Sequence, residues 1–140
     1  MIKPRFHMAF PVTDMGDTLA FYTEVLGALV ARSDTRGIDF NFWGHQLSAH
    51  LVETIDDAAT NPVDGQDVPA RHFGVILTPE QWRDLATRIA ASGTAFLIEP
   101  QVRFQGQVGE QSTFFIVDPS GNALEFKSFE NDSQVFASES

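Results

Sequence analysis

Residues 6–12 read FHMAFPV and residues 71–77 read RHFGVIL, and the two stretches share one pattern. Each is a short run of the alternating kind that is typical of a strand, and each carries a histidine near its start. His7 and His72 lie 65 residues apart. A lone histidine in an apolar strand is more often a hydrogen-bonded core residue than a metal ligand, so its meaning depends on whether the repeat continues.

The repeat continues into an amphipathic helix after each strand. Residues 13–27, TDMGDTLAFYTEVLG, begin with Asp14 as the candidate N-cap and end at Gly27. Residues 78–93, TPEQWRDLATRIAASG, begin with a Thr-Pro-x-Gln capping box and end at Gly93. The spacing of 64 between the caps and 66 between the glycines matches that of the histidines. The predicted buried stripes are Met15, Leu19, Tyr22 and Leu26 in the first helix, and Trp82, Leu85 and Ile89 in the second.

Three strand candidates follow each helix. They lie near residues 28–33, 37–43 and 46–53 in the first half, where Gly44 and His45 are the expected turn, and near 95–99, 113–118 and 122–129 in the second, where DPSG joins the last pair. The fold class predicted is α+β, with two tandem β-α-β-β-β modules at about residues 4–53 and 70–130. Residues 53–70, polar and rich in Asp, Pro and Gly, are expected to form a surface connection, and residues 131–140 a tail.

The composition limits the classes of function. The chain has 140 residues, enough for one domain, and a net charge of -10, which disfavours nucleic acids and anionic membranes as partners. It has no long apolar run and no signal-peptide pattern, so we expect a soluble, cytoplasmic protein. Because it contains no cysteine, any metal would be held by His, Asp or Glu.

Strand alternation brings four of these side chains to the same kind of face. His7 lies opposite the apolar face of Phe6, Met8 and Phe10, and His72 lies opposite that of Phe73, Val75 and Leu77. In the last strand of each half, His50 and Glu125 likewise lie opposite the apolar residues. If the helices cover the apolar faces, these four side chains point into whatever the other faces enclose.

Two histidines and one carboxylate suit Fe, Zn, Ni, Co or Mn, and the combination is typical of non-haem Fe(II) oxygenases. We therefore predict that His7, His72 and Glu125 bind a divalent metal. The alternatives are that Glu125 pairs with Lys127 or Arg5 and that His50 is an ordinary strand residue. A buried glutamate without a cation or donor would be costly, which favours the metal.

The chain resembles the vicinal oxygen chelate superfamily in three motifs: AFYTEVLG at residues 20–27, HFGVIL at 72–77 and DPSGNALEF at 118–126. This group includes glyoxalase I, extradiol ring-cleaving dioxygenases, fosfomycin-resistance proteins and bleomycin-binding proteins. The resemblance spans about residues 4–130 and implies a cupped mixed sheet around a divalent metal that two substrate oxygens chelate. It places His7, His72 and Glu125 at the family's ligand positions, whereas glyoxalase-like members have an acidic or amide ligand near His50.

The resemblance implies a metal-dependent enzyme that acts on a small molecule, and a homodimer. We expect dioxygenase-like chemistry on a catechol-like substrate with Fe(II), and His50 as a catalytic base or a residue that orients O2. A glyoxalase-like lyase or isomerase and a metal-free, drug-sequestering binding protein are the alternatives. Substrate contacts are expected from the loop residues Arg103, Phe104, Gln107 and Glu110, for which a solvated surface loop is the competing interpretation.

Overall fold

A computed structural model describes residues 3–56 and 59–138 and divides the chain into two compact units. The first unit comprises Met1–Asp57 and Asp118–Gly121, and the second Ala58–Val117 and Asn122–Ser140. The last two residues of the predicted tail lie outside the described residues. Within those two described ranges, no helix has the length and apolar character that crossing a membrane requires.

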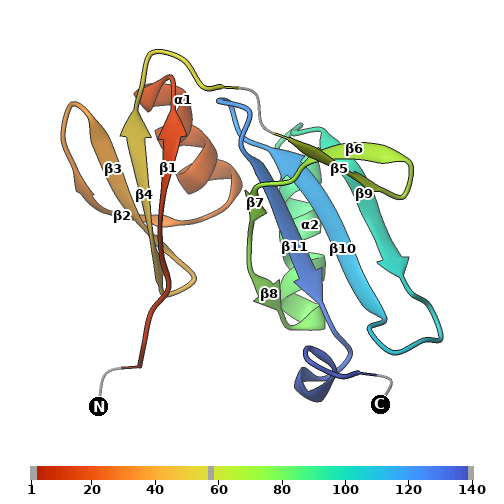
Figure 1. The fold of residues 1–140 in the computed structure, drawn as a ribbon. Coiled ribbons are helices and arrows are strands. Elements are labelled where there is room, and N and C mark those ends of the chain that lie inside the picture. The colour runs from red at the N-terminus through yellow and green to blue at the C-terminus, as the bar shows by residue number, and fades with distance from the viewer. Residues whose placement is uncertain (1–2, 57–58, 139–140) are drawn as a thin grey trace. The chain divides into compact units, whose positions relative to one another are not determined.

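The first unit is a four-stranded sheet with a helical segment on one face (Figure 1). Its elements are β1 (His7–Val12), α1 (Met15–Ala20), the π-helical turn η1 (Phe21–Val25), β2 (Leu29–Ser33), β3 (Gly37–Phe42) and β4 (His45–Leu51). The strand order is β1-β4-β3-β2, with β1 parallel to β4 and the other pairs antiparallel. The predicted β-α-β-β-β order of the first half is confirmed.

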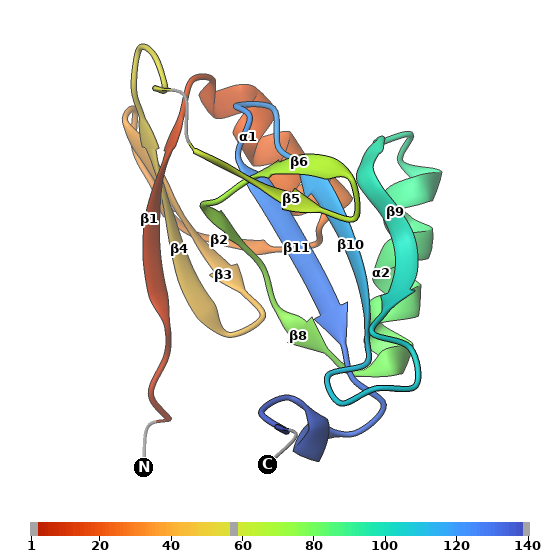
Figure 2. The same cartoon turned by 45° about the vertical axis from the view of Figure 1, so that its right-hand side comes forward.

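The second unit repeats this arrangement. Its elements are β5 (Thr60–Val63), β6 (Gln66–Pro69), β7 (His72–Phe73), β8 (Ile76–Leu77), α2 (Pro79–Ala91), β9 (Phe96–Arg103), β10 (Gln111–Val117), β11 (Ala123–Ser128) and the short η2 (Asp132–Gln134). The sheet order is β7-β11-β10-β9, and β8 continues β7 along β11. In the views of Figures 1 and 2, α2 covers one face of this sheet and the β5–β6 hairpin lies on the other.

The capping predictions hold for both helices, but the buried face of the first one differs. Asp14 accepts the amide of Asp17 at 2.8 Å, and Thr78 and Gln81 form the reciprocal capping box. Leu19, predicted to be buried, is 42% exposed, whereas Thr18 is buried. The buried residues Thr18, Tyr22 and Leu26 lie four positions apart, whereas the predicted stripe alternated steps of four and three. The wider turn of η1 accounts for the longer spacing.

The turn between β3 and β4 also differs from the prediction by one residue. Trp43 and Gly44 occupy it with φ of 50° and 86°, the pair of positive values that a tight hairpin turn of the primed type requires. His45, predicted to lie in the turn, is therefore the first residue of β4. Its Nδ1 accepts the amide of Phe6 at 3.0 Å.

The segment between the modules, predicted to be a plain surface connection, contains the β5–β6 hairpin. Val63 and Val68 are buried there, and they pack with Ile98 and Phe115 on the sheet face opposite α2. Two valines in a polar stretch are too few to show an alternating pattern, which is why the sequence did not predict these strands. The hairpin consequently covers part of the face on which Glu125 lies.

A buried hydrogen bond joins the first helical segment to the turn before β11. The Tyr22 hydroxyl donates to Asp118 Oδ2 at 2.9 Å, and the Tyr22 ring stacks on Phe40 with 5.1 Å between centroids. Tyr22 is fully buried, as predicted for a core residue. Burial first, and then the charge and hydrogen bond of Asp118, raise the pKa of Tyr22 well above its ordinary value.

Replacing Tyr22 with Phe is expected to lower the free energy of unfolding by about 1.5–3 kcal/mol, because a buried hydrogen bond to a charged group is lost. Because the pKa of Tyr22 is higher in the folded than in the unfolded protein, its contribution to stability is complete below pH ~10. That contribution is lost as the pH rises above this value. The wild type should therefore lose more stability than Tyr22→Phe in alkaline solution. Tyr22 is the only tyrosine, so tyrosinate absorbance should appear only on unfolding. Its appearance near pH ~10 in folded protein would contradict the buried hydrogen bond.

Candidate metal centre

The two predicted ligands of the second unit lie on neighbouring strands. β7 pairs in parallel with β11 so that His72 is opposite Ala123, and Glu125 follows two residues later on the same face of the sheet. Between β7 and β8 the backbone of Gly74 comes so close to Glu125 that a Cβ there would overlap the Glu125 carbonyl group. The glycine thus allows the histidine strand to approach the glutamate strand.

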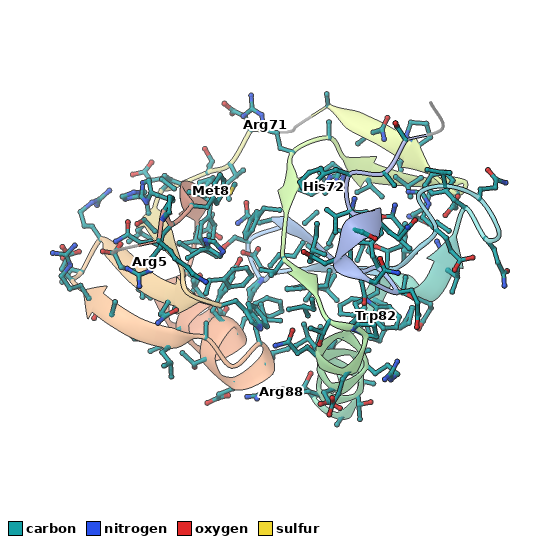
Figure 3. The ribbon with its side chains drawn as sticks, turned by 90° about the horizontal axis from the view of Figure 1, so that it is seen from below. Arg5, Met8, Arg71, His72, Trp82 and Arg88 are labelled. Carbon is teal, nitrogen blue, oxygen red and sulfur yellow. The ribbon has the colours of Figure 1, made fainter. Side chains whose placement is uncertain are left out.

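The imidazole of His72 has a defined orientation. Its Nδ1 lies 2.9 Å from the carbonyl oxygen of Pro69 at the end of β6. A carbonyl oxygen only accepts, so Nδ1 carries the proton, and in the neutral ring Nε2 has the lone pair. The ring also contacts Phe115 edge to face, with 5.2 Å between centroids. Figure 3 shows the position of His72 in the second unit.

The carboxylate of Glu125 is buried, with 8% of the residue exposed. Its Oε2 accepts the hydroxyl of buried Thr113 at 2.5 Å. Its Oε1 lies 3.4 Å from His72 Nε2 and 3.9 Å from Lys127 Nζ. One oxygen of the carboxylate is thus held by the protein, while the other faces the lone-pair nitrogen of the imidazole.

A cation between or beside these two atoms would relieve their repulsion, and the Lys127 ammonium already lies 3.9 Å from Oε1. Two ligands that each lie about 2.1 Å from one metal ion are separated by about 3.0–3.4 Å in octahedral or tetrahedral geometry, which fits the pair His72 Nε2 and Glu125 Oε1. Metal-binding histidines usually donate their other N–H to a carbonyl or carboxylate, and ligating carboxylates are themselves hydrogen-bonded. Both features are present here, so the residues fit a divalent metal.

The other predicted site residues of the first half lie in the first unit. His7 begins β1 on the face opposite buried Phe10 and Val12, and His50 lies near the end of β4. Both are exposed, and the predicted alternation holds in β1, whereas Ser48 on the face of His50 in β4 is buried. Across residues 3–56 and 59–138, the structure gathers no three His, Asp or Glu side chains into one complete metal site. The three-ligand site that includes His7 therefore stays a prediction. The structure brings two of its three members, His72 and Glu125, close together.

The predicted substrate residues lie in and beside the β9–β10 loop. Arg103 Nε is 3.0 Å from Asp64 Oδ2 at the tip of the β5–β6 hairpin, without the alignment of a hydrogen bond, and its guanidinium lies over the ring of Phe104. Glu110 accepts the amide of Gly106 at 2.7 Å, which shapes the loop. Phe104 is 46% exposed and Gln107 is exposed. Arg103 thus already has a carboxylate partner from the hairpin.

Three participants in this arrangement were missed in the sequence. Thr113 donates a hydrogen bond to Glu125, and Phe115 contacts the His72 ring. The Pro69 carbonyl accepts the hydrogen bond of His72 Nδ1 and thereby fixes the tautomer of the imidazole. Thr113 carried a weak signal, because it is a polar residue at the start of the otherwise apolar run TFFIV. A backbone carbonyl has no signal in the sequence.

The model of the Glyoxalase/Bleomycin resistance protein/Dioxygenase superfamily matches residues 6–126. Among curated proteins, the virulence protein STM3117 of Salmonella typhimurium is 26% identical over 127 residues, which cover 88% of this chain and 82% of that protein. Both matches extend over the two halves of the chain.

Two solved structures are similar over almost their whole length. A glyoxalase/bleomycin resistance protein/dioxygenase from Alicyclobacillus acidocaldarius is 32% identical, with a TM-score of 0.81 and coverage of 95% of this chain and 96% of that one. A mutant of the fosfomycin resistance protein FosX from Listeria monocytogenes, complexed with Mn(II) and a dihydroxypropylphosphonic acid, is 18% identical, with a TM-score of 0.72 and coverage of 97% and 98%. The second likeness concerns the fold alone.

Proposed function

Because this chain belongs to the glyoxalase/bleomycin resistance protein/dioxygenase superfamily, we propose that it is a metal-dependent enzyme that acts on a small molecule with two neighbouring oxygens. The observation that carries the proposal is the 3.4 Å separation of His72 Nε2 and Glu125 Oε1, with the opposite atom of each side chain held by the protein. These two hydrogen bonds leave His72 Nε2 and Glu125 Oε1 facing each other, which suits two ligands of one ion.

His7, His72 and Glu125 would hold the ion, which we propose to be Fe(II), with Zn, Ni, Co or Mn as alternatives. The Mn(II) in the FosX complex supports a divalent cation in this fold. When bound, the metal would supply Lewis-acid polarisation of the substrate oxygens. The protein contributes the fixed imidazole of His72, the desolvated carboxylate of Glu125 and the apolar support of Phe115.

His50 is the proposed catalytic residue of the first unit. It lines a hollow of about 470 Å³ together with Arg32, Arg36 and Gly37. Gly37 lies opposite His50 in the β3–β4 ladder, so no side chain from that position fills the space beside the imidazole. An exposed imidazole beside a hollow can accept a proton from a substrate hydroxyl or orient a small molecule.

Dioxygenase-like cleavage of a catechol-type substrate is the reaction we favour, since two histidines and one carboxylate are typical of non-haem Fe(II) oxygenases. A glyoxalase-like lyase or isomerase is less favoured, because glyoxalase-like members have an acidic or amide ligand at the position of His50. A metal-free binding protein is the second alternative, in which His72 and Glu125 would form only a structural pair.

The experiment is anaerobic reconstitution with Fe(II), followed by catechol-type substrates with and without O2 and by hemithioacetals. We expect O2-dependent turnover of a catechol that falls about 100-fold or more in His50→Ala, in line with the loss of a general base. Oxygen-independent turnover of a hemithioacetal that His50→Ala abolishes would show the glyoxalase-like alternative. Tight binding of the substrates to metal-free protein without turnover would show the binding protein.

We further propose that the protein is a homodimer and is located in the cytoplasm. β2 is an edge strand of the first sheet, and Leu29 and Val30 on it are 67% and 43% exposed. An edge strand with exposed apolar side chains is a surface that proteins usually cover, and pairing with a second copy would cover it.

A further inference from the structure

Lys127 lies two residues beyond Glu125 on the same face of β11, opposite Thr113 of β10. Its Nζ is 3.9 Å from Glu125 Oε1, the same oxygen that faces His72 Nε2 at 3.4 Å. A single carboxylate oxygen therefore lies within 4 Å of both the Lys127 ammonium and the His72 imidazole.

The two partners of this ion pair differ in freedom. The Lys127 side chain is 36% exposed, whereas that of Glu125 is 8% exposed and is held by Thr113. A lysine can keep its apolar stem against the protein while its ammonium group changes partners. If the ion pair opens, the Lys127 side chain would therefore move and Glu125 would stay in place.

A divalent ion and the Lys127 ammonium are like charges that compete for Oε1. Their repulsion over a few ångströms is substantial in a partly buried site, so a metal ion would weaken the hold of Glu125 on Lys127. The ammonium would then need another anionic partner on the same face. A negatively charged oxygen of a substrate that chelates the metal would be a partner of this kind.

We propose that Lys127 is a positioning residue that exchanges Glu125 for an ionised oxygen of the substrate when the metal site is filled. The inference rests on the proposed function and names its substrate class, which is a compound with a negatively charged oxygen beside the chelating pair, such as a catecholate. For Lys127→Met it predicts a higher affinity for the metal and a lower affinity for the substrate. Lys127→Met removes a competitor of the metal, and it also removes a partner of the substrate.

The test measures the dissociation constant of Mn(II) and then that of nitrocatechol on the Mn(II)-loaded protein. We expect Lys127→Met to bind Mn(II) about 10-fold more tightly and nitrocatechol about 10-fold more weakly, as expected for one charge-assisted contact. Lys127→Arg should restore most of the nitrocatechol affinity. Arg83→Met is the matched control, because it removes one exposed positive charge from α2 on the other face of the sheet, and it should change neither constant more than twofold.

A second readout uses the scarcity of lysine, since Lys3 and Lys127 are the only two in the chain. Amine-selective labelling of Lys127, followed by mass spectrometry, should become faster when Mn(II) is added and slower again with nitrocatechol. Failure of the wild type to bind Mn(II) would overturn the proposed metal enzyme. Normal Mn(II) binding with an unchanged nitrocatechol constant in Lys127→Met would overturn only the role of Lys127.

Discussion

Replacing Gly74 with Ala is expected to lower the free energy of unfolding by about 2–3 kcal/mol and to abolish metal binding. The added Cβ would overlap the carbonyl group of Glu125 and lie 3.2 Å from its amide nitrogen. Both neighbours are backbone atoms of a buried strand, so the clash is relieved only if the segment between β7 and β8 moves away from β11. Overpacking of this kind costs 1–3 kcal/mol or more, and the gain from a stiffer unfolded chain is at most about 1 kcal/mol.

The displacement would separate the two predicted ligands as well, because His72 lies two residues before Gly74 and Glu125 is the residue that the methyl group meets. Thermal unfolding and Mn(II) titration of the purified variant measure the two effects. Gly16→Ala is the matched control, since a Cβ there meets only Asp14 Oδ1 at 3.5 Å within α1. That variant should be as stable as the wild type or more stable, and wild-type behaviour of Gly74→Ala would refute the close approach.

Replacing Glu125 with Gln should lower the affinity for the metal about 1,000-fold. The metal-free variant should be as stable as the metal-free wild type. The amide oxygen of Gln can still accept from Thr113, and its N–H group can donate to the lone pair of His72 Nε2. The substitution thus removes a buried charge without leaving a buried group unpaired, which is often neutral or stabilising.

The measurement is thermal unfolding with and without Mn(II). At a concentration about 1,000-fold above its dissociation constant, the ion should stabilise the wild type by about 4 kcal/mol, and this gain should fall to about 0.4 kcal/mol in Glu125→Gln. A Mn(II)-dependent shift that persists in the variant would show that Glu125 is not a ligand. A strong loss of stability in the metal-free variant would instead show that the carboxylate is a structural ion-pair partner of Lys127.

The placement of His72 and Glu125 on one sheet face follows from local rules, and the structure places them there. Strand alternation predicts that His72 and Glu125 lie opposite the apolar residues that α2 covers, and a shift of one residue would have reversed them. The 65-residue repeat identified β7 as the counterpart of β1. The capping box of Thr78 and Gln81 is likewise a local signal, and the structure confirms it.

The remaining features depend on contacts that no local pattern records. The β5–β6 hairpin is stabilised by Val63 and Val68 against Phe115, which are distant in sequence. The exposure of Leu19 follows from a π-helical turn, and Trp43 adopts a positive φ that the sequence does not suggest. The ion pair of Arg103 with Asp64 depends in turn on the hairpin, so the environment of Arg103 could not be predicted without it.

The metal content of purified protein, loaded with Mn(II) and freed of excess ion, tests the central claim that His72 and Glu125 bind a divalent metal. The account predicts one ion per chain in the wild type and in His45→Ala, whose imidazole accepts the amide of Phe6 instead. It predicts near-complete loss of the ion in His72→Ala, in which the fold is retained because the apolar faces supply the core. Full occupancy in folded His72→Ala would contradict the account.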